Sequence, residues 1–448
     1  MTIDPHDRLA VLDESAERAA GEAGENDMLP GLRATTREER RRAFQILFVC
    51  LLSLGMGQSL FFAVLPPIAR DLGMTEFQTS MIFSLSALMW VLTSTFWGGQ
   101  SDYIGRKAVI LMGLLGFAVS TFIFAIVVSL GMAGLVSLAL MFPLLISARA
   151  IFGAFSSGTM PASQAYVADR TTRMQRASGV AQIGAAFGLG TVVGPGFAAA
   201  MTAVHILAPF YAVSVLALGS AFFIWWALPE RTPPKTKISE RKRRRLSLTD
   251  RRVLPFLILG VLMSISLSMM MQMAAFYFMD TMQIEGNEAT QLVSVGFMTM
   301  AMAMLFAQLG LIQRFDFSVQ LLLRWGATIM VLAYCLLIFG GSYGVLVSAM
   351  ALAGLGFGLL RPGLMAGASL SVSPSEQGGI AGLIGSTAAT GHILNPFIGI
   401  PLYHLSPQLP FLLGAVLMVA ILLFSMLHPV IRNIRAMVEE EEADLHPH

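Results

Sequence analysis

Twelve long apolar runs, separated by short polar segments, constrain the fold of this chain more than any other feature. Most are close to or above the ~20 residues that a helix needs to cross a bilayer. Hydrophobic residues make up 55% of the chain and charged residues only 12%, whereas soluble proteins average about 25% charged residues. We therefore expect an all-α polytopic membrane protein, with Pro66 and Pro67 closing the first run. The runs are 44–69, 80–97, 108–130, 135–165, 177–201, 209–228, 253–279, 289–312, 319–340, 344–369, 378–403 and 409–427.

The positive charges are segregated, and this segregation predicts the orientation of the helices. Among the Lys and Arg residues, Arg70 alone falls in a loop assigned to the outside, and Arg149 and Arg361 fall inside apolar runs. The rest lie in the termini, in the loops assigned to the cytoplasm or, for Arg324, just inside the start of the run 319–340 beside such a loop. Because basic loops stay inside, both termini are expected in the cytoplasm and the protein in the inner membrane. The polar N-terminus has no apolar core of a cleavable signal peptide.

The chain divides into two halves of six runs each, 44–229 and 253–428, joined by the polar linker 230–252. Residues 1–43 and 429–448 are expected to be cytoplasmic tails. Two six-helix repeats side by side are typical of a rocking transporter with its substrate at their interface. An offset of 201 residues carries Gly153, Pro161, Ala165, Gly184, Gly190 and Pro195 onto Gly354, Pro362, Ala366, Gly385, Gly391 and Pro396.

The loop between the second and third runs concentrates glycine and charge. Gly98 and Gly105 allow close backbone approach. Arg106 and Lys107 place the loop on the cytoplasmic side. Asp102 can bond to the N-terminus of a facing helix and so latch one conformation. The alternative is an ordinary basic loop that only orients two helices.

Residues 98–107 read Gly-x-x-x-Asp-x-x-Gly-Arg-Lys and resemble the loop 2–3 signature of the major facilitator superfamily. Gln100 stands where the family usually has Leu, and Tyr103 where it usually has Arg. The resemblance implies that this loop belongs to a cytoplasmic gate. Asp169 follows a segment that resembles the cytoplasmic end of helix four in tetracycline-type exporters, and we expect it to join the loop cations in an ion network. A solvated loop with unrelated charges is the alternative for Asp169.

The fifth run contains Gly190-x-x-x-Gly194-Pro195, which resembles the fifth-helix motif of the drug:proton antiporter branch and favours export. Glycines four residues apart, here and at Gly184 and Gly188, form small faces that another helix can approach. Pro195 is expected to kink the helix because it removes a hydrogen bond. Generic tight packing is the alternative. The chain has no Gly-Lys dipeptide for a phosphate loop, which excludes ATP-driven transport by this chain alone.

Four ionisable residues are candidates for coupling: Arg149, Arg361, His392 and Asp280. A charge in mid-membrane is functional by default, and residues 149–153 resemble the fourth-helix motif implicated in proton transfer, with Phe152 in place of Gln. A snorkelling Arg149 and a merely hydrogen-bonded His392 are the alternatives. Asp280 closes the seventh run near the outer face, as a helix-end residue or as a proton acceptor. The first run holds no acid of the kind that family members often carry.

Methionine is abundant in the seventh run, and methionine side chains adapt to varied apolar shapes. One face of this run is therefore a candidate lining for a promiscuous cavity, while packing against lipid or neighbouring helices is the alternative for most of the methionines. The substrate-cavity candidates are Gln58, Gln272, Phe276, Tyr277 and Asn395.

Together these observations predict a secondary active transporter that exports a small lipophilic solute or drug by alternating access, coupled to protons. The expected partners are the solute, protons and lipid; no nucleic acid, metal or cofactor is expected, and the protein is expected to be a monomer. An enzyme is disfavoured because the apolar runs lack paired carboxylates or a His/Cys/Asp cluster. The alternative function is a permease of the same superfamily for a metabolite or siderophore, in either direction, with no role in drug resistance.

Overall fold

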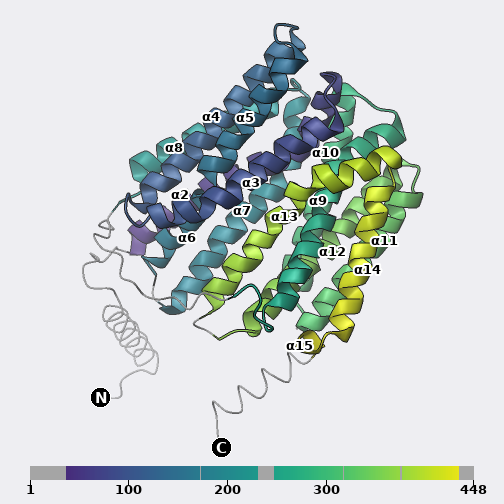
Figure 1. The fold of residues 1–448 in the computed structure, drawn as a ribbon. Coiled ribbons are helices and arrows are strands. Elements are labelled where there is room, and N and C mark those ends of the chain that lie inside the picture. The colour runs from purple at the N-terminus through teal and green to yellow at the C-terminus, as the bar shows by residue number, and fades with distance from the viewer. Residues whose placement is uncertain (1–36, 172, 231–246, 316, 374–375, 433–448) are drawn as a thin grey trace, which may run out of the picture.

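The computed structural model describes residues 37–171, 173–230, 247–315, 317–373 and 376–432, and its regular elements in this part of the chain are all helices (Figure 1). The N-terminal half forms α2 (Arg37–Asp71), α3 (Glu76–Gln100), α4 (Arg106–Met132), α5 (Leu138–Ser156), α6 (Thr159–Ala168), α7 (Arg173–Thr202) and α8 (Ala208–Ala227). The C-terminal half forms α9 (Leu254–Met282), α10 (Gly286–Phe306), the π-helical turn η1 (Ala307–Leu311), α11 (Val319–Phe339), α12 (Tyr343–Leu370), α13 (Gln377–Leu405), α14 (Leu409–Leu427) and the short α15 (Pro429–Arg432).

Eleven helices in the described residues are long and apolar enough to cross a membrane, with α5 and α6 counted as one span, Leu138–Ala168. The 29-residue helix α13 completes a set of twelve. The all-α, twelve-helix architecture expected from the apolar runs is therefore confirmed. The basic cluster 241–245 of the linker and nearly all of both tails lie outside the described residues.

The expectation that Pro66 and Pro67 close the first helix is wrong, because α2 continues through both residues to Asp71. Membrane helices tolerate proline where neighbouring groups satisfy the freed carbonyls. The chain turns instead at Gly73, whose φ of 75° lies in the left-handed region that favours glycine. Thr75 then starts α3 with a capping box, accepting a hydrogen bond from the backbone N–H of Gln78 at 3.2 Å. Helix α7 likewise continues through Pro195.

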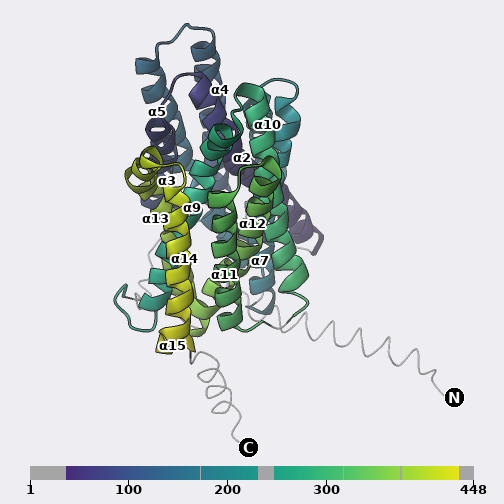
Figure 2. The ribbon, with the colours of Figure 1, turned by 90° about the vertical axis from the view of Figure 1, so that its right-hand side faces the viewer.

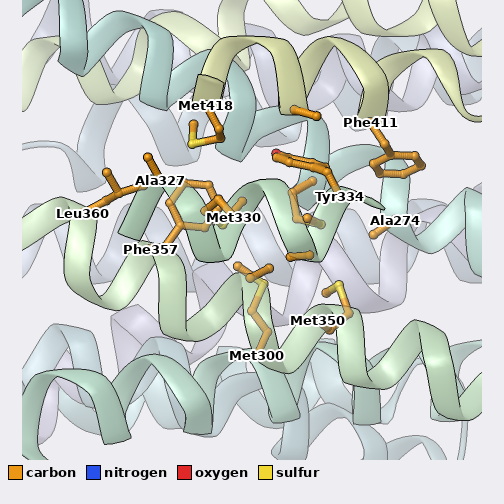
Figure 3. Packing of buried hydrophobic residues seen from close by; sticks show 14 of the residues in the cluster. Ala274, Met300, Ala327, Met330, Tyr334, Met350, Phe357, Leu360, Phe411 and Met418 are labelled. Carbon is orange, nitrogen blue, oxygen red and sulfur yellow. The ribbon is translucent and has the colours of Figure 1, made fainter. Parts of the chain in front are cut away.

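Each half of the chain has its own hydrophobic core, and the two bundles lie side by side (Figures 1 and 2). We call α2–α8 the N-terminal bundle and α9–α15 the C-terminal bundle. In the first, the Phe61 ring lies 5.1 Å from Phe124 and 4.8 Å from Phe210. In the second, the Tyr334 hydroxyl bonds to Ser266 within a core rich in methionine and phenylalanine (Figure 3).

The sequence repeat corresponds to equivalent helix contacts in the two bundles. A Cβ on Gly153 of α5 would overlap the carbonyl oxygen of Ser86 on α3, and a Cβ on Gly354 of α12 would overlap that of Met300 on α10. The same relation holds for Gly190 of α7 against α2 and for Gly391 of α13 against α9. These four glycines are needed because the backbones approach too closely for any side chain. The repeat offset therefore marks the closest helix pairs in each bundle.

The bundles touch each other near one end of the molecule. We call the end where α2 begins and α14 finishes the terminal end, and the opposite end the closed end. Helices α3 and α13 meet near the closed end, where the Ser84 hydroxyl donates to the carbonyl oxygen of Ile393 at 2.9 Å and the Phe77 and Phe397 rings lie 6.3 Å apart. The hydrogen bonds, ion pairs and ring contacts that join described residues of the two bundles lie toward the closed end.

Candidate functional site

The closed end is held by an ion cluster with residues from both bundles. Arg70, in the last turn of α2, donates to Asp280 of α9 at 2.5 Å and to Glu76 of α3 at 2.9 Å. The Tyr403 hydroxyl of α13 donates to the second oxygen of Asp280, and His404 lies 3.4 Å from Glu76. Arg70 and Asp280 thus join the bundles directly, and both side chains are partly exposed.

The chemistry of this cluster allows it to open. A partly exposed ion pair contributes only ~0–1 kcal/mol, so little free energy is needed to separate Arg70 from Asp280. Asp280 was a sequence candidate, whereas Arg70 and Tyr403 were not. The available signal for Arg70 was its position as the one cation in a loop assigned to the outside.

A buried polar network crosses between the bundles below this cluster. Gln272 Oε1 of α9 accepts from the Ser80 hydroxyl of α3 at 2.6 Å and from Asn395 Nδ2 of α13 at 3.1 Å. Asn395 Nδ2 also lies 3.1 Å from Ser80 Oγ. All three side chains are about 1% exposed. The structure thus unites two of the sequence candidates, Gln272 and Asn395, and adds Ser80 from the other bundle.

His392 completes this network, and its protonation state is coupled to it. Because Gln272 Oε1 already accepts two hydrogen bonds, its amide nitrogen is the atom that faces His392 Nδ1 at 3.1 Å. Because an amide nitrogen can only donate, His392 Nδ1 must accept this hydrogen bond. The imidazole of His392 is therefore assigned as neutral, with its proton on Nε2. The imidazole stacks on Phe62 of α2 at 5.6 Å, and Phe62 stacks on Phe83 at 4.7 Å. A proton on Nδ1 would force Gln272 to turn and break its contacts with Ser80.

Arg149 lies in the interior of the N-terminal bundle, between two phenyl rings. Its guanidinium carbon is 4.0 Å from the ring centre of Phe61 and 4.2 Å from that of Phe152. The residue is 2% exposed, and its Nε and Nη1 have no hydrogen-bond partner in the described part of the chain. A desolvated cation–π contact is worth about 2 kcal/mol, which offsets part of the ~2.5–3.5 kcal/mol cost of a mid-membrane arginine. Phe152, which departs from the superfamily motif, therefore has a defined role here.

Arg361 differs from Arg149 in its surroundings. Its side chain is exposed, although the residue lies more than two turns from either end of α12. Gly354 and Gly358 face α10 from the same helix, whereas Phe357 and Leu364 are buried in the bundle core. At 100° per residue, Arg361 lies between these two directions. No described residue forms an ion pair with it.

The signature loop forms an ion network at the terminal end, within the N-terminal bundle. Arg106 pairs with Asp102, and its Nε lies 3.3 Å from Asp169 Oδ2. Gly105 has a φ of 98°, and its position beside the Glu230 carboxylate leaves little room for a side chain. Lys107 donates its backbone N–H to Glu230 and its Nζ to the Trp225 carbonyl oxygen, each at 2.8 Å. The structure thus brings together the loop and Asp169. A Cβ added at Gly98 would meet only Pro161, at 4.0 Å, so no close backbone approach requires glycine there.

The signature loop was expected to bond through Asp102 to the N-terminus of a facing helix. The start of α13, which is the candidate for that helix, already has a carboxylate of its own. Glu376 accepts hydrogen bonds from the hydroxyl of Ser373 at 2.8 Å and from its backbone N–H at 3.2 Å, and lies 3.4 Å from Arg252. These hydrogen bonds from Ser373, with a smaller effect of Arg252, hold the pKa of Glu376 below its usual range. The group is therefore negative, and it favours a basic partner over Asp102.

The remaining sequence candidates lie outside the polar network. Tyr277 donates to the carbonyl oxygen of Leu337 at 2.7 Å inside the C-terminal bundle, and Phe276 lies beneath Arg70 at 5.3 Å. Gln58 is partly exposed, with a buried Oε1 that has no partner among the described residues. Gly190 and Gly194 pack against α2, with Pro195 buried beside them. Gly184 and Gly188, in contrast, would meet nothing within 4 Å if a Cβ were added, so no helix approaches that face in this structure.

Comparison with known proteins agrees with this architecture. Residues 47–391 match the Major Facilitator Superfamily. The chain is 26% identical over 380 residues to the quinolone resistance protein NorA of Staphylococcus aureus, covering 83% of this chain and 92% of that protein. It is 25% identical over 392 residues to multidrug resistance protein 1 of Bacillus subtilis, covering 85% and 94%.

Two solved structures share the fold. The human organic anion transporter MFSD10 superposes with a TM-score of 0.60 at 22% identity, covering 86% of this chain and 99% of that one. An inward-facing, unoccupied bacterial homologue of the human lysosomal transporter Spinster gives 0.67 at 14% identity, covering 90% and 99%. From its helices, its two bundles and the match over most of its length, the chain belongs to the Major Facilitator Superfamily.

Proposed function

We propose that this protein exports a small solute or drug by alternating access, driven by protons. The observation that carries the proposal is the asymmetry between the ends: Arg70 and Asp280 tie the bundles at the closed end, while no such contact joins described residues at the terminal end. Two bundles that are joined at one end only are one of the two states that alternation needs. The relatives named for quinolone and multidrug resistance favour a drug-like solute and export.

The orientation of the cycle follows from the charges. Arg40, Arg41, Lys107 and Arg170 lie at the terminal end, which favours a cytoplasmic location for that end. Arg70 is the exception and belongs to the outer, closed end. A multi-pass protein of the inner membrane that works as a monomer, with no cofactor besides the proton gradient, is part of the proposal.

The coupling proton is proposed to act on Asp280. Arriving from outside, it neutralises the carboxylate and releases Arg70, so the closed end loses its cross-bundle ion pair. His392 provides a second proton site in the cleft, because its protonation would break the contact of Gln272 with Ser80. Solute enters from the cytoplasm before this step and leaves to the outside after it. Arg149 would keep a fixed charge in the moving N-terminal bundle.

The terminal end must close while the outer end is open. Gly382 has open space beside it and lies on the same α13 face as Ile393, which meets α3 near the closed end. That space allows the terminal halves of α3 and α13 to approach. Lys107 of the signature loop would then meet Glu376, with Asp102 holding the neighbouring Arg106 in place.

An accumulation screen tests the proposal. A pump-deficient host expressing the protein should accumulate less of at least one drug or metabolite, and a protonophore should abolish the difference. Asp280→Asn should remove most of the proton-driven efflux, while Glu288→Gln, an exposed acid near the same end, should not. Uptake of a single nutrient in place of efflux would favour the permease alternative. Unchanged accumulation of every compound, or full coupling in Asp280→Asn, would contradict the proposal.

A further inference from the structure

The ionisable side chains deep inside the membrane helices are all basic in the part of the chain that the structure describes. Three basic side chains lie more than two turns from the ends of their spans, namely Arg149, Arg361 and His392. Every described carboxylate of these helices lies within one turn of a helix end. Those carboxylates are Glu39, Asp71, Glu76, Asp280 and Glu288. The transport path therefore holds no described acid to neutralise a cationic solute.

Arg361 is the arginine of this set that a solute can reach. Arg149 is 2% exposed and covered on two sides by Phe61 and Phe152, so a solute in the cleft has no access to it. Arg361 is exposed and has no ion-pair partner among the described residues. Gln272 lies about two turns nearer the closed end.

We infer that the solute carries a negative charge and that Arg361 binds it; this inference rests on the proposed function, because it names the substrate class of the same cleft. A cation in the middle of a membrane helix is costly unless it finds a partner, and none of the described residues supplies a counter-charge to Arg361. The planar guanidinium presents two parallel N–H donors that match a carboxylate or sulfonate. The apolar body of the solute would lie toward Phe62 and Phe83, which stack at 4.7 Å beside the polar network. The preferred solutes are organic anions, or zwitterions whose acid group meets Arg361.

A charge series of probes with one ring system tests this inference. 2-Naphthoate, methyl 2-naphthoate and 2-naphthylmethylammonium are similar in size and carry a negative, a neutral and a positive group. Binding is measured by isothermal titration calorimetry on the full-length protein in detergent. We expect 2-naphthoate to bind roughly tenfold more tightly than the ammonium probe, the difference that one unscreened charge makes at moderate distance.

The variants separate a binding role from a structural one. Arg361→Gln should abolish the preference for the anion, and Arg361→Lys should keep part of it because the charge remains without the two-pronged geometry. Arg314→Gln, which removes an exposed arginine from the loop after η1, should leave the preference unchanged. The inference is overturned if the ammonium probe binds as tightly as 2-naphthoate, or if Arg361→Gln keeps the anion preference.

The failure of this inference and the failure of the proposed function are distinguishable. If 2-naphthoate binds through Arg361 but no solute crosses proteoliposomes under a pH gradient, the binding site stands and the transport function fails. If cationic drugs are exported and no anion preference is found, transport stands and the inference fails.

Discussion

Arg70 and Asp280 lie 210 residues apart in the chain, yet their side chains meet at 2.5 Å across the seam between the two bundles. Each also has a partner on another helix, Glu76 for the arginine and Tyr403 for the aspartate. The pair therefore connects four helices, with two from each bundle. This arrangement makes the closed end sensitive to the charge of one carboxylate.

Neutralising Asp280 should open the closed end. Loss of a partly exposed ion pair costs up to about 1 kcal/mol, so the open population should rise by up to about fivefold in Asp280→Asn and in Arg70→Gln. Spin labels at the exposed residues Val204 and Leu405, in a background with Cys50 and Cys335 replaced by Ser, report the distance between bundles at this end.

The control for this measurement is Glu288→Gln, which also removes a carboxylate near the closed end and should leave the distance distribution unchanged. If Asp280→Asn gives the same distribution as the unmutated protein, then Asp280 does not hold this end closed.

A bulky residue at position 382 should obstruct closing of the terminal end. Gly382→Leu fills the open space beside this residue of α13 and should leave the protein folded. We expect transport to fall by tenfold or more, which corresponds to a rise of ~1.4 kcal/mol in the barrier of the closing step. Gly219→Leu is the matched control, because Gly219 also has open space but lies on α8. Equal transport rates for these two variants would show that the space at Gly382 is not needed for the cycle.

Arg149 should be needed for function and not for stability. Arg149→Met removes a buried charge that has no ion pair and keeps the length of the side chain. Because burying a charge without a partner is costly, we expect a Tm at least equal to that of the unmutated protein, together with a loss of proton-coupled flux. Arg149→Lys should also lose flux, since an ammonium cannot stack between Phe61 and Phe152 in the same way. A fall of Tm in Arg149→Met, or full flux in Arg149→Lys, would assign the arginine a structural role.

Glu376 should stabilise the state in which the terminal end is closed. Spin labels at the exposed residues Ser178 and Phe315 report this end. Glu376→Gln should lower the closed population by up to about fivefold, as expected for an exposed pair. Asp250→Asn removes a nearby carboxylate that contacts Arg252 at 2.8 Å and should have a smaller effect.

The effect of acid on this contact has a defined sign. The pKa of Glu376 is lowered, mainly by its hydrogen bonds from Ser373. The ionised form, and any stability that it contributes, is therefore present above the usual glutamate value of ~4.3 and is lost only as the pH falls through the lower folded value. Loss of the contact between Lys107 and Glu376 at pH 6, measured in the Asp280→Asn background, would contradict the role of Glu376.

The sequence was sufficient to predict the helical architecture, because each membrane helix needs a long apolar run that can be found by hydropathy alone. The runs placed the helices to within about two turns, and the 201-residue offset found the glycines at which backbones touch. The errors lie at helix ends: Pro66 and Pro67 do not stop α2, since proline in a membrane helix is satisfied by neighbours that the sequence does not reveal.

The site was less accessible from the sequence because it is built between bundles. Asp280, Gln272, His392 and Asn395 stood out as polar residues in apolar runs, but their partner Ser80 is too common a residue to be noticed. The sequence also gave no reason to separate Tyr277, which faces the core of its own bundle, from Gln272 five residues earlier. Only the helical rotation that packing imposes distinguishes these two.

The glycine contacts at Gly190 and Gly391 limit where the molecule can deform. Because α7 lies against α2 and α13 against α9 with no side chain between the backbones, neither pair can slide without a steric collision. Each of these helix pairs should therefore move as one rigid unit, and relative motion should occur mainly at the seam between the two bundles. A displacement of the bundles at the closed end would then be accompanied by an opposite displacement at the terminal end.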